Sequence, residues 1–227
     1  MKTFIFCTAY IDADPQRYSD WINYYYPKIA DFGAKALFLV DDGSSQTNID
    51  PRLNLLAGEQ ALPNRLDSDL NLIHFPDNLG RISVTDFPGW WRSFKFSLPI
   101  AQKYNFDKII HIESDFYIIS SKLIEYIKNI KSGWTALWSK DYKFPETAVQ
   151  IICQDVFNKF ERVNYRRGTK IPAERILPFT KIEKGFNGGR YGEIPDLEIH
   201  LDELPKSIDY VGQVPRLSTI KRIIASN

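Results

Sequence analysis

The first half of the chain alternates short apolar runs with segments of helical pattern, and this order constrains the fold more than any other feature. The apolar runs lie at Thr3–Ala9, Ala36–Val40, Leu70–Phe75 and Lys108–Ile112. The helical segments lie at Pro15–Phe32, Pro51–Ala61 and Trp90–Tyr104, the last containing Pro99, where we expect a kink or a shifted boundary. Strands joined through helices need crossover connections, so the order predicts an α/β fold that is Rossmann-like, with a mostly parallel central sheet and helices on both faces.

The second half of the chain has a different pattern and is predicted to be mixed α+β. Strands are expected at Phe116–Ser120, Trp134–Ser139 and Thr147–Cys153, and helices at Lys122–Ile130 and Gln154–Val163. No composition break divides the 227 residues, so we expect a single domain, 1–227, with a ligand-binding half at 1–115 and a mixed half at 116–227. Four glycines between Gly185 and Gly192 predict a mobile loop over residues 184–192.

The balance of charge gives no sign of nucleic-acid binding. Lysine and arginine number 29 against 28 aspartates and glutamates, a net charge of +1, so a nucleic-acid partner is disfavoured. The N-terminal apolar run is too short for a secretory signal or a membrane span, which predicts a cytoplasmic protein. Cys7 and Cys153 lie in strand-like runs and are expected to be buried thiols without chemistry.

The apolar run that ends at Ile112 leads directly into Glu113-Ser114-Asp115. Open α/β sheets bind their ligands at the carboxyl edge, and two carboxylates placed there need a cation. Hard oxygen ligands suit Mg²⁺ or Mn²⁺, which also neutralises a diphosphate, so the pair predicts a metal-nucleotide site. The alternative is that both carboxylates only solvate the end of a strand.

Polar turns follow the other predicted strands as well. Asp41-Asp42-Gly43-Ser44 comes after the second strand and can bind a ribose or a nucleobase, although the same residues also make an ordinary turn. Asn78-Leu79-Gly80-Arg81 follows the third strand. Arg92 and Lys95 then lie near the start of a helix, where phosphate is stabilised, unless they form a surface-facing basic pair.

The order of these signals, with Thr8-Ala9-Tyr10 at the end of the first strand, resembles the nucleotide-sugar half of the GT-A glycosyltransferases over residues 3–155. It is similar above all to the large inverting family typified by bacterial polysaccharide synthases. The resemblance implies a nucleotide-sugar donor, a divalent metal, and a saccharide or lipid-linked acceptor. The chain departs from the family pattern at Glu113, where aspartate is usual, and at Gln46-Thr47-Asn48, where an acid-x-Thr continuation is usual.

The resemblance also implies roles for individual residues. The base and ribose fall to Thr8, Tyr10, Asp42 and Ser44, and Arg92 lies near the diphosphate. The full set expected around the nucleotide sugar is Thr8, Ala9, Tyr10, Asp41, Asp42, Ser44, Asn78, Gly80, Arg81, Arg92, Lys95, Glu113, Ser114 and Arg190. Asp115 is the stronger metal ligand, and Glu113 faces the ribose or a metal-bound water. The glycine-rich loop that carries Arg190 is expected to close over the diphosphate as a lid.

Inverting transfer also needs a carboxylate base, and three acids beyond the metal motif are candidates: Asp141, Glu146 and Glu174. Glu174 is favoured because the family's base commonly opens a helix there, and a helix amino end helps to keep a carboxylate ionised. The alternative is a capping or surface acid paired with Arg175. His200 is a candidate further metal ligand, since several GT-A enzymes add a late histidine, or else a structural histidine in a strand.

Two other functions stay open at this stage. A sugar nucleotidyltransferase shares the sheet and the metal, but it would carry a glycine-rich basic loop after the first strand, where this chain has Asp12 and Asp14. The non-enzymatic alternative is an inactive module that binds carbohydrate. The basic, apolar ending Lys221–Asn227 allows at most peripheral membrane contact, at the inner face. The sequence does not specify the sugar, the nucleotide, the acceptor or the oligomeric state.

Overall fold

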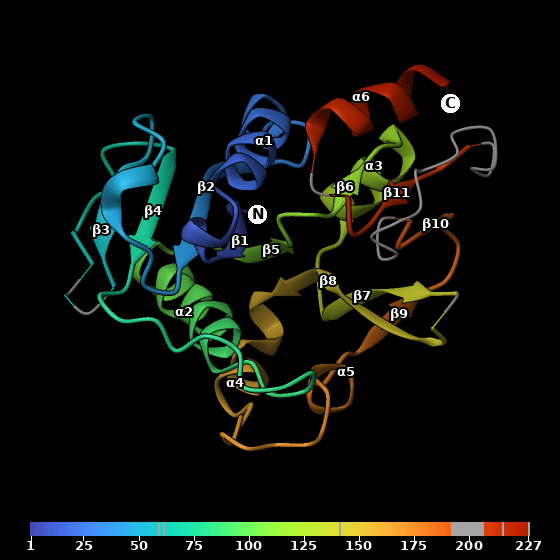
Figure 1. The fold of residues 1–227 in the computed structure, drawn as a ribbon. Helices are drawn as coiled ribbons and strands as arrows, with labels where there is room; N and C mark the ends of the chain where they lie inside the picture. The colour runs from blue at the N-terminus through green and yellow to red at the C-terminus, as the bar shows by residue number, and fades with distance from the viewer. Residues whose placement is uncertain (59, 61, 141, 192–206, 215, 227) are drawn as a thin grey trace.

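A computed structural model describes residues 1–58, 60, 62–140, 142–191, 207–214 and 216–226. Within these residues eight strands form one sheet in the order β3-β4-β2-β1-β5-β8-β7-β9 (Figure 1). The strands are β1 Thr3–Ala9, β2 Ala34–Asp41, β3 Asn54–Ala57, β4 Leu70–His74, β5 Lys108–Ile112, β7 Trp134–Ser139, β8 Phe144–Cys153 and β9 Lys181–Glu183. The first five in the order are parallel to one another, β8 runs antiparallel to both β5 and β7, and β9 is parallel to β7.

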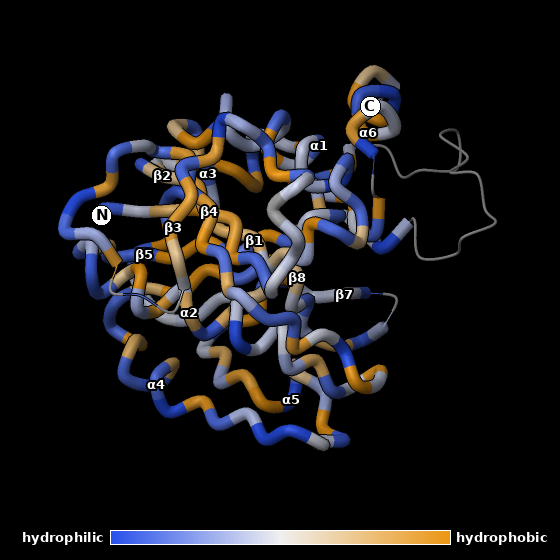
Figure 2. Tube along the Cα trace, turned by 60° about the vertical axis from the view of Figure 1, so that its left-hand side comes forward, coloured by the Kyte–Doolittle hydropathy of each residue, from blue (hydrophilic) through white to orange (hydrophobic). Residues whose placement is uncertain are grey.

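Helices cover both faces of this sheet, each over its own hydrophobic core. One core involves α1 Pro15–Tyr25, α3 Ser121–Asn129 and α6 Leu217–Ser226, and the other involves α2 Pro88–Tyr104 and α4 Phe157–Glu161. Strand β1 supplies both cores alternately: Ile5 and Cys7 face the first, and Phe4 and Phe6 face the second. The hydrophobic residues of the sheet accordingly lie inside the molecule in Figure 2.

A smaller sheet and several short helices complete the described structure. The smaller sheet has the order β10-β11-β6, with β10 Gly188–Gly189, β11 Tyr210–Val211 and β6 Tyr117–Ile118. The short helices are η1 Ile11–Ala13, η2 Tyr26–Lys28, η3 Gln46–Asn48, η4 Gln154–Val156 and α5 Ala173–Ile176. No helix among the described residues has the length and apolar character needed to cross a bilayer.

The predicted α/β class, the mostly parallel sheet and the helices on both faces are confirmed. Both cysteines are buried and unbridged, as expected. The helix predicted at Pro51–Ala61 is wrong, because residues 54–57 pair in parallel with β4 as the edge strand β3. Helix α2 does not end at Pro99 but continues through it to Tyr104, since the proline is exposed while its neighbours Leu98 and Ile100 are buried in the core.

Two residues of the glycine-rich loop have a fixed place in the smaller sheet. Gly188 and Gly189 pair with Tyr210 and Val211 of β11, and a Cβ on Gly188 would lie 2.4 Å from the carbonyl oxygen of Tyr210. Glycine at position 188, which has no Cβ, allows the two backbones to approach this closely. Residue 192 lies outside the described residues, and the lid motion predicted for residues 184–192 stays a prediction.

Candidate active site

Two cavities open at the carboxyl edge of the parallel strands and share part of their walls. The first, of about 510 Å³, is lined by the ends of β1 and β5 and by residues that follow β2 and β4. The second, of about 840 Å³, lies between the start of β8, helix α5 and Arg190. Glu113 and Asp115 line both. The predicted acidic pair therefore lies in the wall that the two cavities share.

Glu113 is fixed through both of its carboxylate oxygens. The hydroxyl of Thr8 donates to Oε2 at 2.8 Å, the indole of Trp90 donates to Oε1 at 2.5 Å, and His111 Nε2 lies 3.0 Å from Oε1. Burial opposes the charge on Glu113, but the His111 ring and the two donors outweigh it, so the pKa of this carboxyl lies below its ordinary value. Glu113 is an ionised carboxylate with little freedom to turn.

Asp115 has few partners and an unfavourable environment for its charge. Burial and repulsion from Glu113 raise its pKa to about 6. Among the described residues it forms one ion pair, a loose one with the Arg17 guanidinium at 3.8 Å, and 17% of its side chain is exposed. The carboxylate thus faces the cavities rather than being held inside a tight ion pair, and a cation in the cavity would relieve its repulsion from Glu113.

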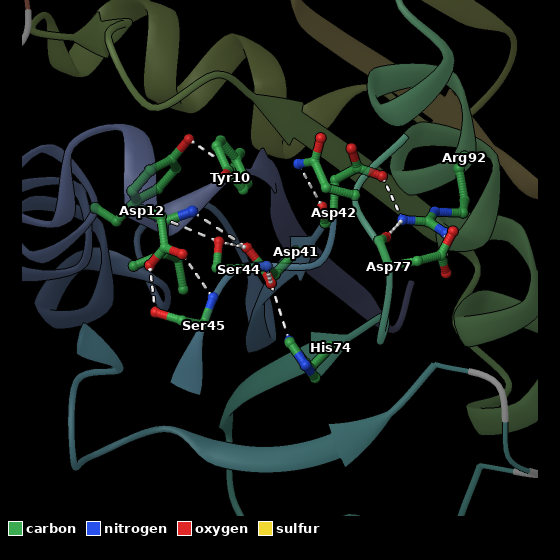
Figure 3. Close-up of polar contacts among 12 residues, drawn as sticks. Tyr10, Asp12, Asp41, Asp42, Ser44, Ser45, His74, Asp77 and Arg92 are labelled. Atoms are coloured by element: carbon green, nitrogen blue, oxygen red, sulfur yellow. Dashed lines mark hydrogen bonds and ion pairs between the residues drawn. The ribbon is translucent and has the colours of Figure 1, made fainter. Parts of the chain in front are cut away.

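The Asp41-Asp42-Gly43-Ser44 turn is held together largely by its own acids (Figure 3). Asp41 is fully buried and accepts from the backbone of Ile11 at 3.2 Å and from the hydroxyl of Ser44 at 2.6 Å, with His74 Nδ1 at 3.0 Å. Asp41 and Ser44 line neither cavity. They keep the turn in shape, and a direct contact of either residue with the nucleoside stays a prediction.

Asp42 links this turn to the loop after β4 and to helix α2. Its Oδ2 accepts from the backbone N–H groups of Leu79 and Gly80 at 3.1 and 2.8 Å. A Cβ on Gly89 would lie 1.9 Å from the same oxygen, so only glycine fits at this position. Burial raises the pKa of Asp42 despite the Gly80 N–H and the charge of Arg92. The side chain nevertheless lines the first cavity.

The two cations predicted near the diphosphate are engaged elsewhere. Arg92 donates to Asp42 Oδ1 at 2.5 Å and to Asp77 Oδ1 at 3.2 Å, as Figure 3 shows. Lys95 donates to the carbonyl of Val163 at 2.8 Å. Neither side chain lines the two cavities. The cations that do line the first cavity are Arg17 and Arg81, and Arg17 is one that the sequence did not indicate.

The candidate bases differ in how much of each carboxylate is free. Glu146 is 1% exposed and pairs with both Nε and Nη2 of Arg190, at 2.8 and 2.9 Å. Glu174 is half-buried in the first turn of α5, and within the described part of the chain its carboxylate accepts one long hydrogen bond, from the Thr147 hydroxyl at 3.4 Å. Both line the second cavity. Asp141 and His200 lie outside the described residues.

The remaining predicted residues line one or both of the two cavities. Those that line the first are Thr8, Ala9, Tyr10, Asn78, Gly80, Arg81 and Ser114, and Arg81 and Arg190 line the second. Sequence reasoning missed Gln213, which lines both. Its backbone φ is +61°, and the next residue, Val214, donates its N–H to the carbonyl of Asp115 at 2.9 Å. Only the fold places this C-terminal segment beside Asp115.

No model of a protein family matches the chain, and no curated protein matches it. A glycosyltransferase involved in glycosylation of the major capsid of PBCV-1 matches at 9% identity, with a TM-score of 0.54 and all of both chains covered. A putative glucose-1-phosphate thymidylyltransferase from Bacillus anthracis, in complex with sucrose, matches at 10% identity and a TM-score of 0.52, over 99% of this chain and 94% of that one.

A mannosyltransferase from Pyrobaculum calidifontis, in complex with GDP-Man and Mn²⁺, matches at 11% identity over 80% of this chain and 54% of that chain, with a TM-score of 0.45. At such low identities a match concerns the course of the backbone. The chain has a GT-A-like fold. The predicted fold class is therefore confirmed by the first comparison as well as by the strand order.

Proposed function

We propose that the protein is a metal-dependent glycosyltransferase that moves a sugar from a nucleoside diphosphate sugar to a hydroxyl of a saccharide or lipid-linked acceptor, with inversion. The observation that carries this proposal is the position of Glu113 and Asp115 in the wall shared by two cavities. Group transfer needs two ligands whose reacting atoms lie next to each other. It also needs the negative charge that develops on the leaving group to be stabilised there.

The first cavity suits the donor. Its walls come from the carboxyl ends of parallel strands, where open α/β sheets bind nucleotides. Thr8, Tyr10 and Asn78 offer polar groups for the nucleoside, and Tyr10 is 38% exposed, so its ring is available to a base. Arg17 and Arg81 provide positive charge for the diphosphate in place of Arg92, whose guanidinium pairs with Asp42.

The residues present fit a divalent cation of the Mn²⁺ or Mg²⁺ type. Asp115 would bind it directly, because its carboxylate faces the cavity and repels Glu113. Glu113, held by Thr8 and Trp90, would act through the ribose or a metal-bound water. The described residues hold no group of three or more acidic, histidine or cysteine side chains placed to bind a metal ion, so Asp115 would hold the cation together with oxygens of the donor or of water. When bound, such a cation neutralises the leaving diphosphate.

The second cavity suits the acceptor, and Glu174 is the proposed base. The acceptor oxygen attacks the anomeric carbon, its proton passes to the carboxylate of Glu174, and the bond from that carbon to the diphosphate breaks. Glu146 is a poorer base because Arg190 occupies both of its oxygens. Its pairing with Arg190 instead shapes the wall that faces the acceptor.

A sugar nucleotidyltransferase is the second candidate, since a putative thymidylyltransferase shares the fold at a TM-score of 0.52. Such an enzyme has to bind a triphosphate beside β1. In this chain the segment after β1 carries Asp12, which accepts from Ser45, and Asp14, which caps α1 and pairs with Arg216 at 2.8 Å. Two fixed acids there repel a triphosphate, so the transferase is favoured.

A donor screen tests the proposal and its rivals together. The protein is incubated with Mn²⁺ or Mg²⁺ and a panel of nucleoside diphosphate sugars, and the release of nucleoside diphosphate is followed by mass spectrometry. Parallel samples receive a nucleoside triphosphate with a sugar 1-phosphate. Metal-dependent release of a nucleoside diphosphate supports the transferase. Pyrophosphate in the parallel samples would identify a nucleotidyltransferase. No release in any sample, together with sugar binding by calorimetry that is indifferent to metal, would identify an inactive module.

A further inference from the structure

The segment after α4 concentrates positive charge on one exposed edge of the molecule. Between residues 162 and 175 the chain has five cations and one acid, Glu174, whereas the whole chain carries only +1, so the remainder is net negative. Arg166, Arg167 and Lys170 are exposed, and within the described residues none of the three has an ion-pair partner. Such unpaired charge on one edge favours an anionic partner.

Exposed aliphatic side chains lie among these cations. Val84 is 77% exposed, Ile171 53% and Ile82 51%, and all belong to loops at this edge. In Figure 1 the loop before α2 runs beside the segment after α4, and the tube of Figure 2 alternates between hydrophilic and hydrophobic colours there. We name the six side chains together the basic rim: Ile82, Val84, Arg166, Arg167, Lys170 and Ile171.

The two loops of the basic rim are fastened to each other through a buried acid. Asp86, 1% exposed, accepts from the Tyr165 hydroxyl and from the Gly168 N–H at 2.7 Å. The hydroxyl of Thr85 donates to the carbonyl of Thr169 at 3.3 Å. The rim is therefore a built surface that presents its aliphatic and cationic side chains together.

The basic rim is continuous with the mouth of the second cavity. Val84 belongs to both, and Pro172, next to Ile171, lines the cavity wall. Four further cations line the same cavity, namely Arg81, Lys143, Arg175 and Arg190, and the last of these pairs with Glu146. If the rim bound to another surface, molecules in that surface would thus lie at the entrance of the cavity proposed for the acceptor.

We propose that the basic rim docks the protein on a membrane surface of anionic lipids, from which the second cavity takes its acceptor. Cations near such a surface are attracted to it, and aliphatic side chains between them gain by entering the headgroup region. An acidic polysaccharide or a nucleic acid would use the cations but offer no apolar layer for Val84 and Ile171. The docking itself goes beyond the proposed function, and only its link to the acceptor rests on that function.

Vesicle co-sedimentation of the full chain tests the docking without donor, metal or activity. Vesicles of phosphatidylcholine mixed with phosphatidylglycerol should bind the protein, and vesicles of phosphatidylcholine alone should not. The double variant Arg166→Gln and Arg167→Gln should weaken binding by roughly 25-fold, since each cation near an anionic surface contributes about fivefold. Val84→Ser should weaken binding without changing net charge. All three positions are exposed, so thermal unfolding should stay as in the parent.

A matched control uses the other basic segment of the chain. Lys221→Gln and Arg222→Gln remove the same charge from exposed positions of α6 and should leave vesicle binding nearly unchanged. Equal loss in both double variants would mean attraction by net charge alone and would overturn the proposal. So would rim-dependent binding to heparin with no binding to the vesicles. A rim that binds vesicles in a protein without transferase activity would leave the docking standing and remove the proposed function.

Discussion

Asp115 is the side chain on which the proposed reaction most depends, and its charge destabilises the metal-free fold. Its ordinary pKa is 3.8, and burial beside Glu113 raises the folded value to about 6. The penalty is absent below the ordinary value, grows between the two, and is complete above about 6. Asp115→Asn should therefore raise the free energy of unfolding at neutral pH by roughly 1 to 3 kcal/mol, measured by urea unfolding without metal.

The stabilisation by Asp115→Asn should disappear as the pH falls below 3.8, where the aspartate becomes protonated in both states. The same variant should lose metal-dependent release of the nucleoside diphosphate. Asp67→Asn, at an exposed position away from both cavities, is the control and should change neither property. A variant at position 115 that keeps its activity and gains no stability would remove this side chain from the site.

Glu174 and Glu146 differ in how firmly they are paired, so the same substitution should affect stability at one position and not at the other. Glu174→Gln should lower kcat by about 10²- to 10⁴-fold with donor affinity nearly unchanged, the range expected for loss of a general base. Glu146→Gln breaks a buried pairing with Arg190, so it should lower the free energy of unfolding as well as activity. Steady-state kinetics and urea unfolding of both variants measure this. If Glu174→Gln turns over normally, the base lies elsewhere.

At the scale of elements, Arg92 joins helix α2 to the turns after β2 and β4. Its guanidinium lies against Asp42, which is 4% exposed, and losing one partner of such a pair leaves an uncompensated buried charge. Arg92→Ala should therefore lower the free energy of unfolding by about 3 to 5 kcal/mol. The double variant with Asp42→Asn should lose less than the two single variants together, because no charge is then left buried alone.

Lys95→Ala tests the other predicted diphosphate cation in the same helix. It removes one hydrogen bond to the carbonyl of Val163 and should cost less than Arg92→Ala. Urea unfolding separates the two, and donor titration by calorimetry separates stability from binding. If the Arg92→Ala variant is as stable as the parent but binds the donor weakly, Arg92 contacts the diphosphate after all.

At the scale of the whole molecule, the sequence predicted the features that depend on neighbouring residues. It did not predict those that depend on contacts between residues far apart in the chain. Strands β1 and β5 were predictable because each is a short run of mostly apolar residues that favour strands. The edge strand Asn54–Ala57 was not, because its pairing with β4 decides its structure. The role of Arg92 depends on Asp42, fifty residues earlier, and no local sequence pattern predicts that these two residues are in contact. The sequence predicted Arg92 as a phosphate ligand from its charge and its position near a helix start. The fold shows that its guanidinium pairs with Asp42 instead.

Gln213 shows the same long-range effect, since a residue near the end of the chain lines both cavities beside Asp115. Its φ of +61° is costly for a residue with a side chain. Gln213→Gly should therefore raise the free energy of unfolding by about 1 kcal/mol and lower kcat/KM, because a polar residue in the wall of both cavities loses its side chain. Gln213→Ala should lower kcat/KM equally without the gain in stability. If both variants keep the parent kcat/KM, the amide contacts neither ligand and the backbone strain has no part in transfer.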